Sequence, residues 1–288
     1  MGMNYDYPLF RPPSEAKSLI LQITLGCSHN GCRFCEMYKT KQFQVKPLSL
    51  IVEELKFFSA YYPTPLKIFL ADGDAMCLPF DFLMSVLVEI GKVFPDVRRI
   101  SSYSGAQGIL SKSDEELKAL KKAKLSLFYL GLESGDPQIL KDMNKGSMPE
   151  ENIQAVLKAK KNGIKTSVTA VLGLGGRRRS REHGLATAEA VSQMSPNFFS
   201  TLSLMATQGI PLMRDIQSGQ FEILNEEETY LELKTIIENI QGENIIFRSN
   251  HASNPFPLEG ILSRDREKIL KDLEKWINFP HQTEWENY

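Results

Sequence analysis

Short runs of apolar and β-branched residues alternate along the chain with longer segments that carry apolar residues at three- and four-residue spacing. The short runs predict strands, and the longer segments predict amphipathic helices. The strands are expected at residues 18–24, 67–71, 99–103, 127–132, 165–172 and 198–204. The helices are expected at residues 48–61, 79–94, 112–122, 150–162, 181–194 and 226–239.

The strict alternation of strand and helix predicts an α/β fold with a parallel sheet and right-handed crossovers. Residues 126–132 (SLFYLGL) are apolar on both faces, which is typical of a buried parallel strand. Ser113 with Glu116 forms a capping-box pattern at the third helix, and Gly163 follows the fourth. Periodicity alone leaves open whether the sheet is doubly wound or forms a barrel or part of one.

The pattern changes after residue 239. A further strand is expected at 244–249, a polar loop with prolines at 250–258, and a last amphipathic helix at 264–277. We interpret residues 241–288 as a C-terminal extension of a core at about residues 17–240. The whole chain, 1–288, is then a single domain, which agrees with the size at which one hydrophobic core stops growing.

Composition and charge narrow the function classes. Hydrophobic residues make up 42% of the chain and charged residues 24%, which is ordinary for a globular enzyme. A net charge of −1 gives no global field to attract nucleic acid or an anionic membrane, so neither is an expected partner. No long apolar run predicts a membrane span, and residues 1–13 lack the pattern of a secretory signal.

The candidate chemistry lies in a cluster of cysteines directly after the first expected strand. Cys27, Cys32 and Cys35 follow the spacing Cys-x4-Cys-x2-Cys, and the chain has four cysteines in all. Packed thiols of this kind suit metal binding in a reducing compartment, which predicts a cytoplasmic protein. Three thiolates favour a 4Fe–4S cluster with one open iron, and the alternatives are a zinc site completed by His29 or three buried thiols without metal.

The phrase CSHNGCRFCEMYK resembles the radical S-adenosylmethionine (SAM) superfamily, whose signature places an aromatic residue before the third cysteine, as Phe34 does here. The first spacing is one residue longer than in that signature. The sequence is similar to a subgroup akin to oxygen-independent coproporphyrinogen oxidases and the Elongator catalytic subunit. The resemblance implies a partial (β/α)6 TIM-like barrel, a 4Fe–4S cluster held by the three cysteines, bound SAM, and an electron donor such as flavodoxin or ferredoxin.

The resemblance also implies roles for residues that follow the other strands. Asp72, Gly73 and Asp74 match the place where relatives bind the amino group of SAM. Glu133 matches a ribose ligand, and Lys145 matches the partner of the methionine carboxylate, where lysine replaces the more usual arginine. The alternatives without a role in SAM binding are ordinary turn residues for the acidic–glycine segment, a helix cap for Glu133 and a solvated surface charge for Lys145.

The fifth strand ends in glycines that resemble the adenine-contacting edge of the superfamily, which assigns Gly173 to cofactor binding. Thr169 stands where relatives often carry an acidic ribose ligand. Because the four motifs all follow strands of one parallel sheet, we expect them to converge at the same end of a barrel.

Several residues are candidates for choosing the substrate or taking part in the reaction. They are Arg177, Arg178, Arg179 and Arg181 as an anion site, His251 as a substrate contact or proton relay, and Cys77 as a hydrogen-atom donor. The alternatives are a solvated basic loop, a self-satisfied polar loop and a buried inert thiol. Met76, Met205 and Met213 are expected to pack in the core.

The sequence thus predicts a radical SAM enzyme in which reductive cleavage of SAM gives methionine and a 5′-deoxyadenosyl radical. That radical would take hydrogen from a small-molecule or macromolecular substrate that the sequence does not identify. A non-catalytic zinc or iron–sulfur interaction module is the competing hypothesis. Beyond the loop only Cys77 remains, so this sequence supplies no second three-cysteine cluster, and this argues against the usual methylthiolation enzyme.

Overall fold

The computed structural model describes residues 5–62, 64–254 and 257–278. Its main feature is an eight-stranded sheet. The strands are β1 (Leu19–Gln22), β4 (Lys67–Ala71), β5 (Arg99–Tyr103), β6 (Leu125–Glu133), β7 (Lys165–Leu172), β8 (Phe198–Ser203), β9 (Ile246–Arg248) and β10 (Glu259–Ile261), in that spatial order. All neighbouring pairs are parallel except β9 with β10.

The order of the strands in space decides between the two sheet types left open by periodicity. Strands neighbour one another in chain order, so the sheet has no point at which the order reverses, as a doubly wound sheet would. Within the described ranges β1 pairs only with β4, and β10 pairs only with β9, so the curved sheet stays open. The predicted α/β fold with a partial TIM-like barrel is confirmed.

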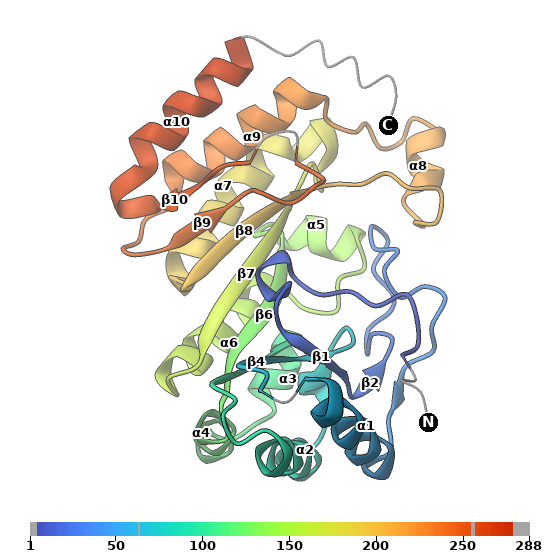
Figure 1. Ribbon diagram of the computed structural model, residues 1–288. Helices are drawn as coiled ribbons and strands as arrows, with labels where there is room; N and C mark the ends of the chain where they lie inside the picture. Colours follow the sequence, from blue (N-terminus) through green and yellow to red (C-terminus); the bar gives the residue numbers. More distant parts are fainter. Residues whose placement is uncertain (1–4, 63, 255–256, 279–288) are drawn as a thin grey trace.

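The long helices cover the outer side of the sheet (Figure 1). They are α1 (Leu48–Tyr61), α2 (Phe80–Val93), α4 (Asp114–Lys122), α6 (Pro149–Lys161), α7 (Gly176–Met194), α9 (Glu226–Asn239) and α10 (Leu262–Asn278). Their apolar faces and the strands form one large buried core. The capping box of Ser113 and Glu116 is present at α4. Five of these helices start one to five residues away from the predicted bounds, and α7 starts at Gly176 and is kinked at Arg179.

Short elements were not predicted, because two to six residues carry no readable periodicity. They are η1 (Pro13–Glu15), the antiparallel pair β2 (Thr24–Leu25) and β3 (Gln44–Val45), η2 (Ala75–Cys77), α3 (Ala106–Leu110), α5 (Pro137–Asp142) and α8 (Met213–Gln217). In Figure 1 the blue amino-terminal segment, α5 and α8 lie on the side toward which the carboxyl ends of β6 and β8 lead. α5 and α8 therefore lie near the end of the sheet where ligands bind in barrel folds.

The C-terminal extension continues the same sheet. The strand expected at 244–249 is present as β9, and the helix expected at 264–277 is present as α10. β10 was not predicted, and it adds an antiparallel strand directly after the expected loop. Residues 255–256 of that loop, residues 1–4 and residues 279–288 of the predicted domain lie outside the described residues.

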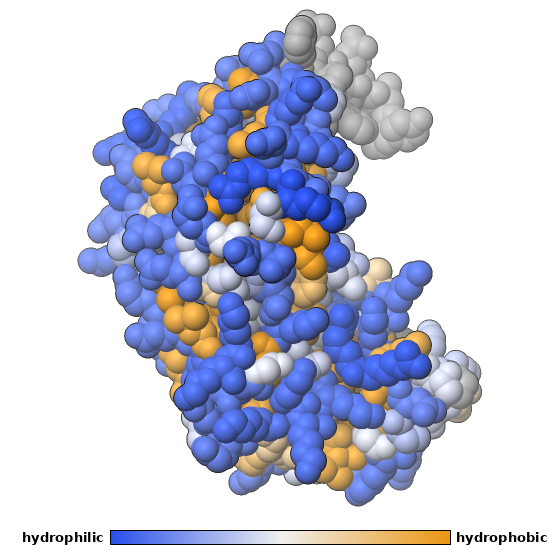
Figure 2. Space-filling view, turned by 90° about the vertical axis from the view of Figure 1, so that its left-hand side faces the viewer, coloured by the Kyte–Doolittle hydropathy of each residue, from blue (hydrophilic) through white to orange (hydrophobic). Residues whose placement is uncertain are grey.

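Figure 2 shows the helix-covered side of the molecule, whose surface is mainly hydrophilic. Among the helices, Val88 on α2, Leu157 on α6 and Leu231 on α9 are exposed hydrophobic side chains. Scattered groups of this kind are normal on a protein surface. Among the helices in the described ranges, none is long and apolar enough to span a lipid bilayer.

Candidate active site

The cysteine loop follows β1 and β2 at the carboxyl end of the sheet. Cys27, Cys32 and Cys35 are partly buried and none is in a disulfide. Burial raises the pKa of all three thiols, that of Cys32 to about 11. Neighbouring thiols of the loop raise the pKa of Cys27 and Cys32 further, while the ammonium group of Lys145 lowers the pKa of all three. The loop thus gathers three thiols near one cation.

A buried carboxylate anchors the start of this loop. Asp72, which follows β4, is 0% exposed, and its Oδ2 accepts hydrogen bonds from Gln22 Nε2 (2.9 Å), the Gly26 backbone N–H (3.0 Å) and Lys41 Nζ (3.0 Å). Its Oδ1 has no hydrogen-bond partner in the described part of the chain. Burial raises the pKa of Asp72, and these three donors oppose the rise. The carboxylate therefore ties β1, the cysteine loop and Lys41 to the end of β4.

The next two residues, Gly73 and Asp74, pack closely against the cysteine loop. A Cβ on Gly73 would lie 2.9 Å from Cys27 Cβ, so only glycine lets the two segments approach this closely. Asp74 is buried, and its carboxylate accepts hydrogen bonds from Ser28 Oγ (2.7 Å) and the Gly105 N–H (3.1 Å). The acidic–glycine segment of the sequence prediction therefore does lie against the cysteine loop.

The other side of the cysteine loop is fastened to the loop between α5 and α6. His29 Nε2 lies 2.7 Å from the carbonyl oxygen of Asn144, and Asn144 Nδ2 donates to the carbonyl of Gly31 at 2.9 Å. The Arg33 backbone N–H donates to the Met143 carbonyl at 2.9 Å. His29 is thus bonded to a carbonyl oxygen, whereas the zinc alternative would use it as a metal ligand. These bonds bring Lys145 next to the thiols.

Glu133 and Lys145 meet beside the cysteines. Lys145 Nζ donates to Glu133 Oε1 at 3.0 Å, and both side chains are less than one-fifth exposed. Glu133 has a φ of 63°, which turns it at the end of β6, where the pairing with β7 shifts register. Burial lowers the pKa of Lys145, but the Glu133 carboxylate together with Cys32 and Cys27 more than offsets this, so the net pKa is raised. The lysine is therefore a fixed cation rather than a solvated surface charge.

Gly173 lies at the end of β7 with a φ of 80°, a conformation that favours glycine. Its N–H donates to Glu232 Oε1 at 2.6 Å. Phe34 packs against a small buried cluster that includes Leu174 and Met213. Residues from β1, β4, β6 and β7 thus reach the same end of the sheet, as the sequence predicted from their shared position.

Two further candidates, and one of the methionines expected to pack in the core, follow strands at this end. Cys77 lies in η2 and is partly buried. Burial, with a smaller contribution from the nearby Asp74 carboxylate, raises the pKa of its thiol to about 12. His251 follows β9, accepts the Ser253 N–H at Nδ1 (3.0 Å), and has its pKa lowered by burial. Met205 is 56% exposed, so the prediction that it packs in the core was wrong.

The arginine run has two members committed to ion pairs within the protein. Arg177 contacts Glu228 at 2.7 Å and Glu222 at 3.4 Å, and Arg179 contacts Asp136 at 2.5 Å. The other two arginines of the run are exposed. This pairing neutralises two of the four arginine charges that the sequence predicted as an anion site.

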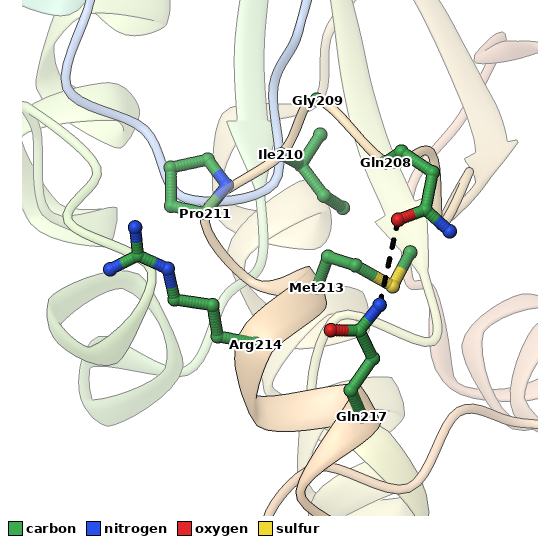
Figure 3. Close-up of a pocket in the computed structure, with 7 residues that line it drawn as sticks. All are labelled: Gln208, Gly209, Ile210, Pro211, Met213, Arg214 and Gln217. Carbon is green, nitrogen blue, oxygen red and sulfur yellow. Dashed lines mark hydrogen bonds between the residues drawn. The ribbon is translucent and has the colours of Figure 1, made fainter.

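A pocket of about 420 Å³ lies beside α8, and Figure 3 shows Gln208 and Gln217 on one side of it and Arg214 on the other. The same segment contacts the cysteine loop, since the Leu212 N–H donates to the Arg33 carbonyl at 3.0 Å. The segment that lines this cavity therefore contacts the cysteine loop, and none of the three thiols lines the cavity.

The donor set suits an iron–sulfur cluster, because three thiols share one loop and a cation stands beside them. In the described part of the chain, no group of three His, Cys, Asp or Glu side chains is gathered tightly enough to hold a metal ion. Cluster binding therefore requires the three thiol side chains to turn toward one point on a loop whose backbone is already anchored on both sides.

Sequence analysis did not identify several residues that support this site through hydrogen bonds and ion pairs. Lys41 is a buried partner of Asp72, and Arg33 forms a 2.5 Å ion pair with Asp215. His183 and Glu232 are buried below Gly173. A readable signal existed for Glu232, because it is a charged residue on the same helix face as the apolar residues of α9.

The curved parallel sheet with a three-thiol loop at its carboxyl end defines the general class, an α/β metalloprotein of the barrel type. A family model described as the radical SAM superfamily matches residues 21–188. The chain therefore belongs to the radical SAM superfamily, and its cofactors are a 4Fe–4S cluster and SAM. This confirms the resemblance recognised in the sequence.

Curated relatives are similar over part of their length. A protein of Methanocaldococcus jannaschii with the provisional name methylthiotransferase is 29% identical over 184 residues, which cover 57% of this chain and 38% of that protein. A methyltransferase of Pyrococcus horikoshii, described as uncharacterized, is 25% identical over 54% of this chain and 32% of its own length. The chain thus spans about a third of the length of these relatives.

Solved structures share the fold. Coproporphyrinogen III oxidase from Escherichia coli superposes with a TM-score of 0.60 at 15% identity, covering 77% of this chain and 51% of that one. Archaeal Elp3 from Methanocaldococcus infernus gives 0.56 at 14% identity, covering 90% of this chain and 63% of that one. The sequence resembles a subgroup akin to these two kinds of protein, and at these identities the likeness concerns the fold.

Proposed function

We propose that this chain binds its 4Fe–4S cluster through Cys27, Cys32 and Cys35 and cleaves SAM reductively at that site. The supporting observation is the cysteine loop itself, which is fastened between the end of β4 and the loop between α5 and α6, with the Glu133–Lys145 pair beside it. A mere zinc or iron–sulfur interaction module would need the thiols but not this buried pair. The enzyme works in the cytoplasm, where its thiols stay reduced.

The chain's own residues would bind and orient SAM. Lys145 would bind the methionine carboxylate, Glu133 the ribose hydroxyls, and the backbone of Gly173 the adenine. Asp72, Gly73 and Asp74 would receive the amino group. The Oδ2 of Asp72 already accepts from three donors within the protein, but its buried Oδ1 has no hydrogen-bond partner in the described part of the chain. We therefore assign two roles to Asp72: its Oδ2 positions the cysteine loop, and its Oδ1 is an acceptor for the amino group, as the resemblance implied.

When bound, the cofactors supply one-electron cleavage of the C5′–S bond, which gives methionine and a 5′-deoxyadenosyl radical that takes hydrogen from the substrate. The electron comes from an external donor such as flavodoxin or ferredoxin. Before cleavage, Lys145 must exchange part of its contact with Glu133 for the carboxylate of SAM. The names of the curated relatives favour group transfer as the outcome, although this sequence holds only Cys77 outside the loop.

The test is formation of 5′-deoxyadenosine by protein reconstituted anaerobically with iron and sulfide, then supplied with SAM and dithionite. We expect product from the wild type and none from the variant with Cys27, Cys32 and Cys35 all changed to Ala. Cys77→Ala is the matched control and keeps the cluster, because Cys77 lies outside the loop. Uptake of zinc without any cluster would contradict the proposal and favour the interaction module.

A further inference from the structure

Behind the carboxyl ends of β6 and β7 lies a buried group of polar side chains that the proposed chemistry does not use. Ser134 and His183 are 0% exposed and Glu232 is 2% exposed. Ser134 directly follows β6, His183 is on α7, and Glu232 is on α9. A buried carboxylate is costly unless donors surround it, so its partners indicate what it holds in place.

Both oxygens of Glu232 accept hydrogen bonds. Oε1 accepts the backbone N–H of Gly173 at 2.6 Å, and Oε2 accepts the hydroxyl of Ser180 at 2.6 Å. Oε1 also lies 3.5 Å from His183 Nε2. Charge-assisted bonds to a carboxylate are among the stronger hydrogen bonds in proteins. Glu232 therefore fixes the direction of the Gly173 N–H at the turn that follows β7.

His183 extends the group to the neighbouring strand. Its Nε2 lies 3.1 Å from the carbonyl oxygen of Val171, and its Nδ1 lies 2.7 Å from Ser134 Oγ. Because a carbonyl only accepts, Nε2 donates, and in the neutral ring Nδ1 then accepts from Ser134. Ser134 Oγ in turn accepts the N–H of Asp136. The imidazole thus joins the ends of β6 and β7.

These two strand ends carry two of the residues assigned to SAM. Glu133 directly precedes Ser134, and Gly173 is bonded to Glu232 itself. We infer that Glu232, acting with His183, is a positioning residue that holds the ribose-binding and adenine-binding turns in one fixed arrangement. This inference rests on the proposed function, since it presumes that these turns receive SAM.

The consequence is a specific loss of SAM affinity. Glu232→Ala leaves the Gly173 N–H and the Ser180 hydroxyl without their acceptor, so we expect the Kd for SAM to rise about tenfold. Glu232→Gln keeps an oxygen that accepts the Gly173 N–H, and its Kd should stay within about threefold of the wild type. The KM for SAM rises in Glu232→Ala, while the cleavage rate at saturating SAM stays within about twofold.

A matched control separates positioning from general loosening of the core. Glu15 is another buried carboxylate, and it accepts hydrogen bonds from Tyr129 Oη and from Arg99, which begins β5 at the opposite end of the sheet. Glu15→Ala should lower the melting temperature without raising the Kd for SAM. The readouts are equilibrium dialysis with SAM, iron and sulfide content, and thermal unfolding, each on the cluster-loaded protein.

The outcomes are separable. The inference is overturned if Glu232→Ala binds SAM as tightly as the wild type, if Glu232→Gln is as weak as Glu232→Ala, or if Glu15→Ala weakens SAM equally. Weak binding by Glu232→Ala with rescue by Glu232→Gln supports it. A cluster-loaded wild type that does not bind SAM at all would overturn the proposed function, and the inference would fall with it.

Discussion

Polar side chains around the thiols pack against glycines, which have no Cβ. A Cβ on Gly131 would overlap Glu133 Oε1, and a Cβ on Gly146 would lie 2.6 Å from His29 Cγ. A Cβ on Gly105 would lie 3.2 Å from an oxygen of Asp74. These glycines therefore act as space for a neighbouring functional side chain, rather than as flexible points.

Gly131→Ala tests this interpretation at the residue that holds Glu133. The new methyl group forces the flexible Glu133 carboxylate away from Lys145, so we expect a roughly tenfold higher Kd for SAM. Gly91→Ala on α2 is the control, since nothing lies within 4 Å of its Cβ, and it should bind SAM normally. Equal SAM affinity in both variants would show that the Glu133 carboxylate needs no reserved space.

Glu133→Ala tests the carboxylate itself. The variant should lower SAM binding and cleavage about tenfold, because it removes a ribose contact and leaves Lys145 without the acceptor that now fixes it. Cluster content should survive, since Glu133 is not a thiol ligand. Iron analysis and 5′-deoxyadenosine formation give the two readouts. Retained cleavage with unchanged SAM affinity would contradict the assignment.

At the scale of elements, the cysteine loop is held by loops rather than by regular structure. Asp72 fastens its beginning, and the segment around Asn144 fastens its middle. The added residue of the Cys-x4-Cys spacing lies in the part of the loop that contains His29, whose ring reaches the Asn144 carbonyl. The longer spacing is therefore accommodated by a contact with the loop that carries Lys145.

Asn144→Gly tests this fastening. Asn144 has a φ of 50°, which glycine adopts without strain, so the variant removes the side-chain bond to the Gly31 carbonyl and little else. We expect a chelator to remove the cluster several-fold faster, because losing one hydrogen bond of about 1 kcal/mol loosens the loop. The decay of the cluster's visible absorbance measures this. An unchanged rate would show that the Asn144 side chain does not secure the loop.

The sequence predicted the long elements because their apolar spacing repeats over many residues, as along α2 and α9. It missed α5 and α8, which are too short for a period to show. The cysteines could be found because their spacing is local. Glu232 and Gly173 are 59 residues apart, so only the fold brings that carboxylate to that N–H. Contacts of this kind depend on tertiary packing, which local patterns do not encode.

At the scale of the whole molecule, the C-terminal extension forms part of the sheet and of the hydrophobic core. β9 pairs with β8, and α10 packs on α9. Phe247 of β9 stacks on Phe199 of β8 with ring centroids 6.0 Å apart, and both rings are 0% exposed. Leu273 of α10 belongs to the same buried core. Residues 1–240 alone would leave these surfaces uncovered.

A chain truncated after residue 240 is therefore expected to lose cooperative unfolding. Removing β9 exposes the edge of β8 and the ring of Phe199, and removing α10 uncovers apolar side chains of α9. Unpaired edges and exposed apolar faces favour aggregation over a folded monomer. Urea unfolding followed by circular dichroism, beside the full chain, measures this. If the truncated chain unfolds in one transition at the same midpoint as the full chain, then the core is independent of the extension. A single coincident transition of the full chain by circular dichroism and tryptophan fluorescence is what one folding unit requires.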